Sequence, residues 1–90
     1  MQFQWDRAKA EHNLRKHSVS FEEASTVFYD ALSVTGHDPD HSVLENRYVV
    51  LGRSAAGRLL AVSHTESADC LRIISARKAT RPERKLYEEG

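Results

Sequence analysis

The segment from Leu71 to Lys85 combines an apolar run with a dense group of cations. Between Ala76 and Lys85 it holds five bases against one acid, Glu83, so its net charge is +4 in a chain whose total charge is zero. A rigid strand end that presents cations beside a helix start can hold a polyanion. The five bases are Arg77, Lys78, Arg81, Arg84 and Lys85.

Helix-start signals precede this segment near the N-terminus. Asp6 can cap a helix over Arg7–His17, because its side chain can accept a hydrogen bond from a backbone N–H of the first turn. Ser20 and Glu23 have the spacing of a capping box and predict a second helix over Phe21–Tyr29. The apolar residues of this second stretch recur at helical spacing, which predicts one buried face.

Four strands are expected between these helices and the C-terminal segment, because β-branched and aromatic runs alternate there with turn signals. Short turns join the last three, so these three must form an antiparallel meander. Thr80 and Glu83 then form a second capping box, which predicts a C-terminal helix with Pro82 in its first turn. The expected strands are Leu32–Gly36, Arg47–Arg53, Arg58–Thr65 and Leu71–Arg77.

The order ααββββα predicts an α+β fold in a single domain over residues 1–90: two N-terminal helices, a four-stranded antiparallel sheet and a C-terminal helix. A composition of 40% hydrophobic and 29% charged residues excludes a disordered chain. The single cysteine, Cys70, rules out an internal disulfide and fits a reducing compartment. No apolar run approaches about 18 residues and no signal peptide is recognisable, so we expect a cytoplasmic protein without membrane association.

A metal site has weak support. The stretch from His37 to His41 contains two histidines and two aspartates, but it includes Pro39 and has no second ligand cluster elsewhere in the chain. Metal sites usually draw ligands from more than one such group. We therefore expect neither a metal nor another cofactor.

Several motifs occur along the chain in a fixed order. They are Phe3-x-Trp5-Asp6, Asn13-Leu14-x-Lys16-His17, Val19-Ser20-Phe21-Glu22-Glu23-Ala24-x-x-Val27-Phe28, Arg47-x-x-x-x-Gly52 and Arg72-Ile73-Ile74-Ser75-Ala76-Arg77-x-Ala79, with Glu83 and Tyr87 after them. This pattern resembles the BrnT family, the toxin component of BrnT–BrnA type II toxin–antitoxin modules. One departure is Ser18, where the family usually has glycine, so we expect a small backbone cost or an altered turn there.

The resemblance implies a RelE-like fold, with helices packed on an antiparallel sheet. It also implies a ribonuclease that cleaves RNA without a metal and arrests growth. The implied partner is a BrnA-like antitoxin with a DNA-binding domain, which would neutralise the toxin, repress the shared operon and assemble with it as a 2:2 heterotetramer. The toxin itself would contact RNA, and DNA only through the antitoxin.

Metal-free RNA cleavage needs a base for the ribose 2′-OH, cations for the phosphorane, and an acid for the leaving 5′-oxygen. Arg77 could hold a phosphate through two parallel hydrogen bonds, and the alternative for it is a salt bridge to a neighbouring helix. The strand otherwise has the pattern of a core strand, and an arginine is costly to bury there without a partner. We therefore favour phosphate binding for Arg77. Ser75 lies on the same strand face and could donate to the phosphate, or could simply be packed.

Four further residues are catalytic candidates, each with a structural alternative. His64 could act as acid or base, but it alternates in register with core residues and could belong to the core edge. Lys16 and His17 are a hallmark of the resemblance, yet cations at a helix C-terminus are also favourable on dipole grounds. Glu83 could transfer protons, although the capping box already accounts for it.

The remaining candidates are phosphate contacts. Arg81 faces solvent at the start of the C-terminal helix and fits such a contact best. The alternative function is a non-catalytic or degenerate protein-binding module that docks an antitoxin-like partner through its basic face. The neutral total charge argues against a strong nonspecific RNA binder, because such proteins usually carry a basic surplus. The expected RNA-binding residues are Lys78, Arg81, Arg72, Arg53 and Ser75.

Overall fold

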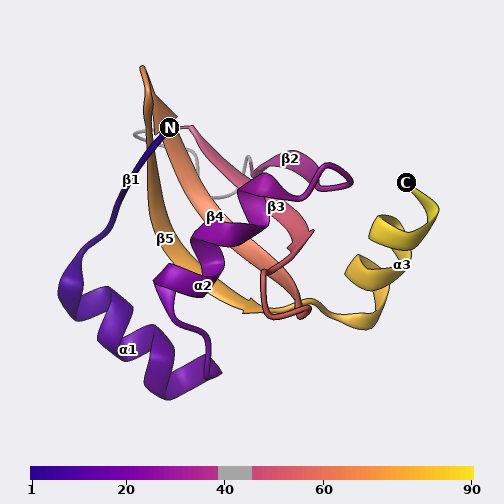
Figure 1. The fold of residues 1–90 in the computed structure, drawn as a ribbon, viewed down its shortest axis with the longest axis horizontal. Helices are drawn as coiled ribbons and strands as arrows, with labels where there is room; N and C mark the ends of the chain where they lie inside the picture. Colours follow the sequence, from indigo (N-terminus) through magenta and orange to yellow (C-terminus); the bar gives the residue numbers. More distant parts are fainter. Residues whose placement is uncertain (39–45) are drawn as a thin grey trace.

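The computed structural model describes residues 1–38 and 46–90, and in these ranges two N-terminal helices lie beside a curved sheet while the C-terminal helix projects to one side (Figure 1). The predicted α+β class is confirmed, and the bounds expected for the first helix and for the second strand match the structure. The elements are β1 (Gln2–Gln4), α1 (Arg7–His17), α2 (Phe21–Ser25), the 3₁₀ helix η1 (Thr26–Tyr29), β2 (Val34–Asp38), β3 (Arg47–Arg53), β4 (Leu59–Ser67), β5 (Cys70–Lys78) and α3 (Arg81–Glu89).

The sheet has five strands rather than the expected four, in the order β1-β5-β4-β3-β2. The additional strand, β1, pairs parallel to Cys70–Arg72 of β5, whereas the other pairs are antiparallel as predicted. A three-residue strand carries too short a pattern to be recognised locally, and its pairing depends on the tertiary fold. The sheet is therefore mixed, with an antiparallel majority.

Side-chain caps begin all three α-helices. Asp6 Oδ1 accepts from the N–H of Lys9 at 3.0 Å, and the Thr80–Glu83 capping box forms as predicted. The Ser20–Glu23 box forms only in part: Ser20 Oγ accepts from the N–H of Glu23, but the Glu23 carboxylate bonds to Arg58 instead of returning to Ser20. A charge-assisted pair with a guanidinium is stronger than a bond to a neutral N–H, which accounts for the difference.

Ser18 ends α1 in the left-handed region, with φ of 58°. Its N–H donates to the carbonyl of Leu14 at 2.9 Å, and its own carbonyl accepts from Arg58 Nη2 at 2.9 Å. A side chain in this region costs roughly 1–2 kcal/mol relative to glycine. Ser18 thus keeps the backbone conformation that favours glycine, and Arg58 helps to hold the turn.

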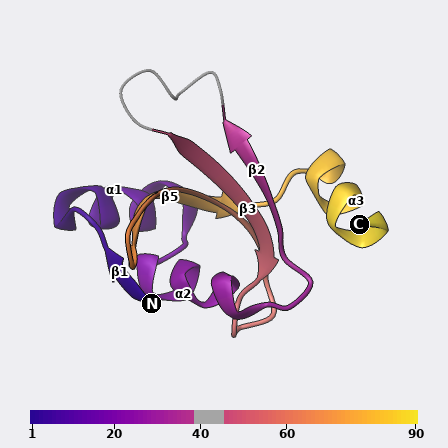
Figure 2. The ribbon, with the colours of Figure 1, turned by 90° about the horizontal axis from the view of Figure 1, so that it is seen from above.

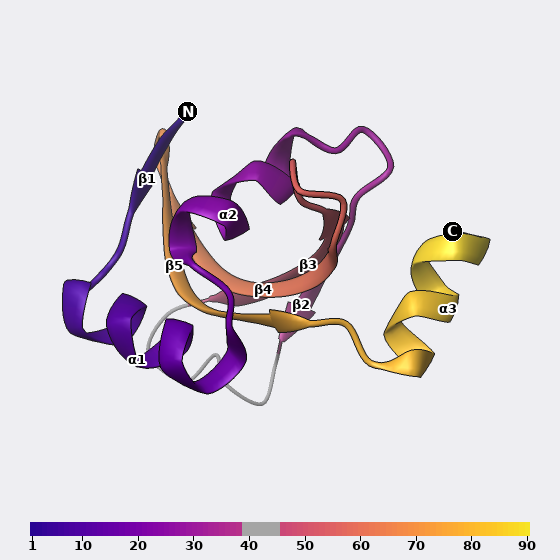
Figure 3. The ribbon, with the colours of Figure 1, turned by 60° about the horizontal axis from the view of Figure 1, so that its bottom comes forward.

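The sheet curls around α2, so it has a concave and a convex face (Figures 2 and 3). The core lies between the concave face and the helices α2 and η1. Because strand residues alternate between faces, the pairing register assigns each side chain to one of them. The core residues are Val19, Phe21, Ala24, Val27, Val50, Leu60, Val62, Ile73 and Ala76.

A β-bulge interrupts the pairing of β4 with β5. Ser63 lies opposite Ser75, while the next residue, His64, lies opposite Ile73, so Ile74 has no partner on β4. A bulge of this kind redirects the side chains around it and occurs often beside functional sites. Here Ile73 enters the core at 1% exposure, whereas Ile74 lies only half-buried.

Asn13 fastens α1 to the edge of β5. Its Nδ2 donates to the carbonyls of Val19 and Ala76 at 2.9 and 2.8 Å, and its Oδ1 accepts from the N–H of Ala76 at 3.1 Å. The side-chain amide thus bonds both backbone groups of Ala76, as a neighbouring strand would. Asn13 is 4% exposed, so all three bonds are shielded from water.

We expect Asn13→Ala to lower the free energy of unfolding by about 3 kcal/mol, because it removes three buried hydrogen bonds and leaves backbone groups without partners. Urea denaturation followed by circular dichroism measures this loss. Gln4→Ala is the matched control, since Gln4 carries an exposed amide, and it should change stability by less than about 0.5 kcal/mol. Equal stability of the two variants would contradict this account of the helix–strand junction.

Candidate active site between the first helix and the last strand

A groove of about 330 Å³ runs between α1 and β5. Two lysines and two histidines line it, and none of the described residues in its lining is a carboxylate. Such a surface attracts phosphate and offers side chains that can transfer protons near neutral pH. The lining residues are Ala8, Lys9, His12, Asn13, Lys16, His17, Ile74 and Ser75.

The arrangement follows from helix geometry. Residues three and four apart occupy the same side of a helix, so Lys9, His12 and Lys16 form one row. Asn13 fixes the rotation of α1 about its axis through its bonds to Ala76, and this turns the row toward β5. The bulge supplies the other wall with Ile74 and Ser75.

Three of the predicted residues share the convex face of β5. By register, Arg72 lies opposite Thr65, Ser75 opposite Ser63, and Arg77 opposite Ala61. Residues two apart on a strand are about 7 Å apart, so Arg77 lies one step beyond the Ser75 wall of the groove. The structure therefore brings Lys16, His17 and Ser75 together and places two arginines on the adjoining sheet surface.

Arg77 forms an ion pair with Glu83 across the junction of β5 and α3. Its Nη1 and Nη2 donate to Glu83 Oε1 and Oε2 at 2.7 and 3.0 Å, and Oε1 also accepts from the N–H of Thr80 at 2.9 Å. The Arg77 guanidinium, with the Thr80 bonds, lowers the pKa of Glu83 to about 2. The salt-bridge alternative for Arg77 is thus present, while 42% of its side chain stays exposed.

His64 lies on the concave face, away from the groove. Its ring stacks on Tyr48 at 5.7 Å between centroids and meets Phe28 edge-on at 4.8 Å. Burial lowers the pKa of His64 despite the opposing effects of the Val62 carbonyl and Glu66, and so favours the neutral ring. The side chain is 2% exposed, and a substrate could reach it only if these rings moved. Its catalytic role stays a prediction.

The other predicted RNA contacts lie in two further places. Lys78 and Arg81 are exposed on either side of Thr80, close in sequence to the Arg77–Glu83 pair. Arg53 lies on β3, separated from β5 by β4, with its guanidinium 5.7 Å from the centre of the Tyr87 ring. The structure does not bring Arg53 to the groove.

Two groove residues escaped the sequence-based prediction, namely Lys9 and His12. The signal was present: both share the helix face of Lys16, three or four residues apart. A helical-wheel projection of the predicted helix places Lys9, His12 and Lys16 in one row, which the Lys16–His17 motif alone does not reveal.

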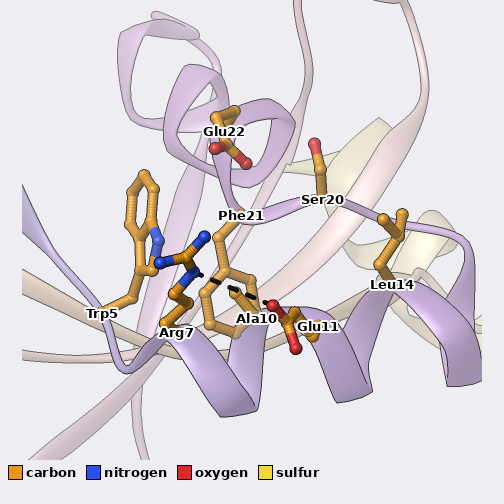
Figure 4. Close-up of a pocket in the computed structure, with 8 residues that line it drawn as sticks. All are labelled: Trp5, Arg7, Ala10, Glu11, Leu14, Ser20, Phe21 and Glu22. Atoms are coloured by element: carbon orange, nitrogen blue, oxygen red, sulfur yellow. Dashed lines mark ion pairs between the residues drawn. The ribbon is translucent and has the colours of Figure 1, made fainter.

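A larger hollow of about 440 Å³ lies on the opposite flank of α1, between α1 and the start of α2 (Figure 4). Trp5, Leu14 and Phe21 give it apolar walls, and Arg7 and Glu11 form an ion pair there at 3.8 Å. Its described lining holds one base, Arg7, against two acids, Glu11 and Glu22, so it attracts a polyanion less than the groove does.

Two other predictions concern metal and membrane. The described residues contain no group of three or more side chains that could hold a metal ion, and residues 39–41 of the histidine–aspartate stretch lie outside them. Among the described helices, none is long and apolar enough to cross a membrane.

The Glu83 carboxylate gives stability a defined pH dependence. Its folded pKa of about 2 lies below the usual 4.5, so its stabilising effect is complete above about pH 4.5 and fades as the pH falls toward 2. We expect Glu83→Gln to cost about 1 kcal/mol at pH 7, since the pair is partly exposed, and less at pH 3. Urea denaturation at both pH values measures the difference.

The control is Glu89→Gln, because Glu89 is exposed and lies 4.0 Å from Lys85. This variant should change stability by less than about 0.5 kcal/mol at either pH. A cost for Glu83→Gln that grew toward pH 3 would contradict the ion pair as described.

Known proteins share the fold and the sequence pattern of this chain. No curated protein sequence matches the chain. The crystal structure of the Brucella abortus ribonuclease toxin BrnT, determined at 1.1 Å resolution, superposes with a TM-score of 0.64 at 21% identity, covering 90% of this chain and 99% of that one. A family model described as the ribonuclease toxin BrnT of type II toxin–antitoxin systems matches residues 5–83. The match spans most of the sequence, and the chain therefore belongs to the BrnT family of ribonuclease toxins of type II toxin–antitoxin systems.

Proposed function

We propose that this toxin is a metal-independent endoribonuclease that arrests growth by cleaving RNA in the groove between α1 and β5. The observation that carries the proposal is the groove itself, where Lys16, His17 and Ser75 meet without a carboxylate in the described lining. A polyanion would be attracted there, while a metal ion would find no acidic ligand.

The chemistry follows from the residue types. An imidazole, that of His17, takes part in moving the proton from the ribose 2′-OH to the leaving 5′-oxygen. The Lys16 ammonium stabilises the charge that develops on the phosphorane, and the Ser75 hydroxyl donates to a phosphate oxygen. The 2′-oxygen then attacks its own phosphate, which yields a 2′,3′-cyclic phosphate and a 5′-hydroxyl.

Arg77 serves in this proposal as a contact for a phosphate beside the scissile bond. Its half-exposed fork lies on the sheet face that continues from Ser75. Glu83 holds the guanidinium in place and acts as a positioning residue, without transferring protons. Arg72, Lys78 and Arg81 extend the same basic surface for flanking phosphates.

Family membership implies a cognate antitoxin. We propose that this partner is a DNA-binding protein, that toxin and antitoxin assemble as a 2:2 heterotetramer, and that the toxin acts in the cytoplasm. An antitoxin that covers the groove would neutralise the toxin by excluding RNA. A chain that binds this partner but never cleaves RNA would instead be the non-catalytic module.

Purified protein should cleave an RNA oligonucleotide in the presence of EDTA. Lys16→Ala should lower the cleavage rate by about 100-fold, because it removes the cation nearest the proposed phosphorane. Gel analysis of the products measures both rates. Lys85→Ala is the matched control, since this lysine is exposed on α3, and it should keep the parental rate.

Two results would contradict the proposal in different ways. If the parent protein leaves RNA intact, or cleaves it only after a divalent metal is added, the proposal of metal-independent catalysis is wrong. Equal rates for Lys16→Ala and Lys85→Ala would leave the ribonuclease standing but move its active site away from the groove.

Substitutions at the Arg77–Glu83 ion pair distinguish the role of the arginine from that of the glutamate. Arg77→Ala should raise KM for RNA about tenfold or more, because it removes a charged phosphate contact. Glu83→Gln should leave kcat within about threefold, since glutamine can still accept from the Thr80 N–H. Steady-state kinetics measures both. A fall in kcat of more than about 100-fold for Glu83→Gln would instead make Glu83 a proton-transfer group.

A further inference from the structure

We propose that His12 is the second proton-transfer group of the groove and works with His17 across the scissile phosphate. This inference rests on the proposed ribonuclease function and adds a residue that the family motifs do not include. Its basis is the position of His12 in the lining of the groove together with Lys16, His17 and Ser75.

His12 and His17 both line the groove, at different points of its α1 wall. They are five residues apart, which is a rise of about 7.5 Å along the helix axis and a rotation of about 140° around it, so they approach the groove from different directions. In-line displacement places the attacking 2′-oxygen and the leaving 5′-oxygen on opposite sides of phosphorus, so two groups on two sides serve it better than one. Lys9 and Lys16 flank His12 at three and four residues, within reach of the same phosphate.

The two histidines in the groove differ from the other described histidines in the partners that their rings contact. Among the described residues, His37 contacts Asn46 and the buried His64 packs between aromatic rings. His12 and His17 have no hydrogen-bond or ion-pair partner in the described part of the chain. Their ring nitrogens are thus available to a substrate. The helix dipole accounts for His17 in the last turn, but it gives no reason for a histidine at mid-helix.

The surroundings of His12 are defined by two elements. From α1 it faces Lys9, Lys16 and His17, and from β5 it faces Ile74 and Ser75. None of these is an acid that would hold the imidazole in a fixed ion pair. A residue in this setting can exchange its proton with the substrate instead of with a protein partner.

The step balances without any cofactor. One imidazole accepts the 2′-OH proton while the 2′-oxygen forms its bond to phosphorus. The bond between phosphorus and the 5′-oxygen breaks, and the other imidazole, in its protonated form, gives a proton to that oxygen. No electron is transferred. At the end of the step the two histidines have exchanged protonation states, because the base has gained a proton and the acid has lost one.

The test compares His12→Ala and His12→Gln with His37→Ala, a histidine that lies on β2. On RNA, both His12 variants should lose at least about 100-fold in kcat, while His37→Ala should stay within about twofold of the parent. The pH–rate profile of the parent should show two limbs, and that of His12→Ala should lack one. Circular dichroism of each variant confirms that the helix is intact.

A second substrate identifies the role of His12. A nucleoside 3′-(4-nitrophenyl phosphate) has a leaving group that departs without a proton, so its cleavage needs a base but no acid. If His12→Ala retains activity on this ester but not on RNA, His12 is the acid. If the variant loses activity on both substrates, His12 is the base. Either result supports the pair.

Retention of more than half of the parental rate on RNA by His12→Ala, with both limbs of the pH profile, would overturn the inference and leave the ribonuclease function in place. Failure of the parent itself to cleave RNA would overturn the proposed function, and the inference with it. The two failures are distinguishable because the parent is assayed beside the variants.

Discussion

The junction between α1 and β5 depends on the amide of Asn13. This one side chain bonds the N–H and the carbonyl of Ala76 and also the carbonyl of Val19, all in a buried setting. It substitutes for a neighbouring strand at the point where pairing with β1 has ended. The rotation of α1 follows from this anchor, and so does the side of the helix that faces β5. Without it, the lysines and histidines of α1 would have no fixed relation to Ser75, and the groove would have only one defined wall.

A second constraint is the distribution of charge in a chain that is neutral overall. Some cations outside the groove are neutralised by a neighbouring acid: Arg58 pairs with Glu23 beside the turn that ends α1, and Arg77 pairs with Glu83 at the end of β5. In the described lining of the groove no acid performs this role. Local pairing explains how a protein without a basic surplus can still offer a basic site. It also explains why net charge alone was a poor guide to RNA binding.

The elements with strong local signals were predicted well, and the tertiary features were not. Arg7–His17 has a cap and a helical pattern, and Arg47–Arg53 has a long apolar run, so their bounds followed from sequence. The strand β1 escaped prediction because three residues cannot signal a parallel pairing with residues 68 positions further along the chain. The partner of Glu23 was also beyond local reasoning, because Arg58 approaches only in the folded chain. The basic segment is evident in the sequence, and Asn13 belongs to one of the motifs. The hydrogen bonds of Asn13 to Ala76 and the bulge in β5, which together build the groove, arise only in the folded chain.

The central claim is that RNA occupies the groove between α1 and β5. Its most direct test is nuclear magnetic resonance of ¹⁵N-labelled protein titrated with an RNA oligonucleotide whose 2′-hydroxyls are all methylated, so that no 2′-oxygen can attack the phosphate and the RNA cannot be cleaved. The account predicts that chemical shifts change first at the α1 residues that line the groove, Lys9, His12, Lys16 and His17, and at Ser75 on β5. Shift changes confined to α3 and β2, with α1 unaffected, would contradict it.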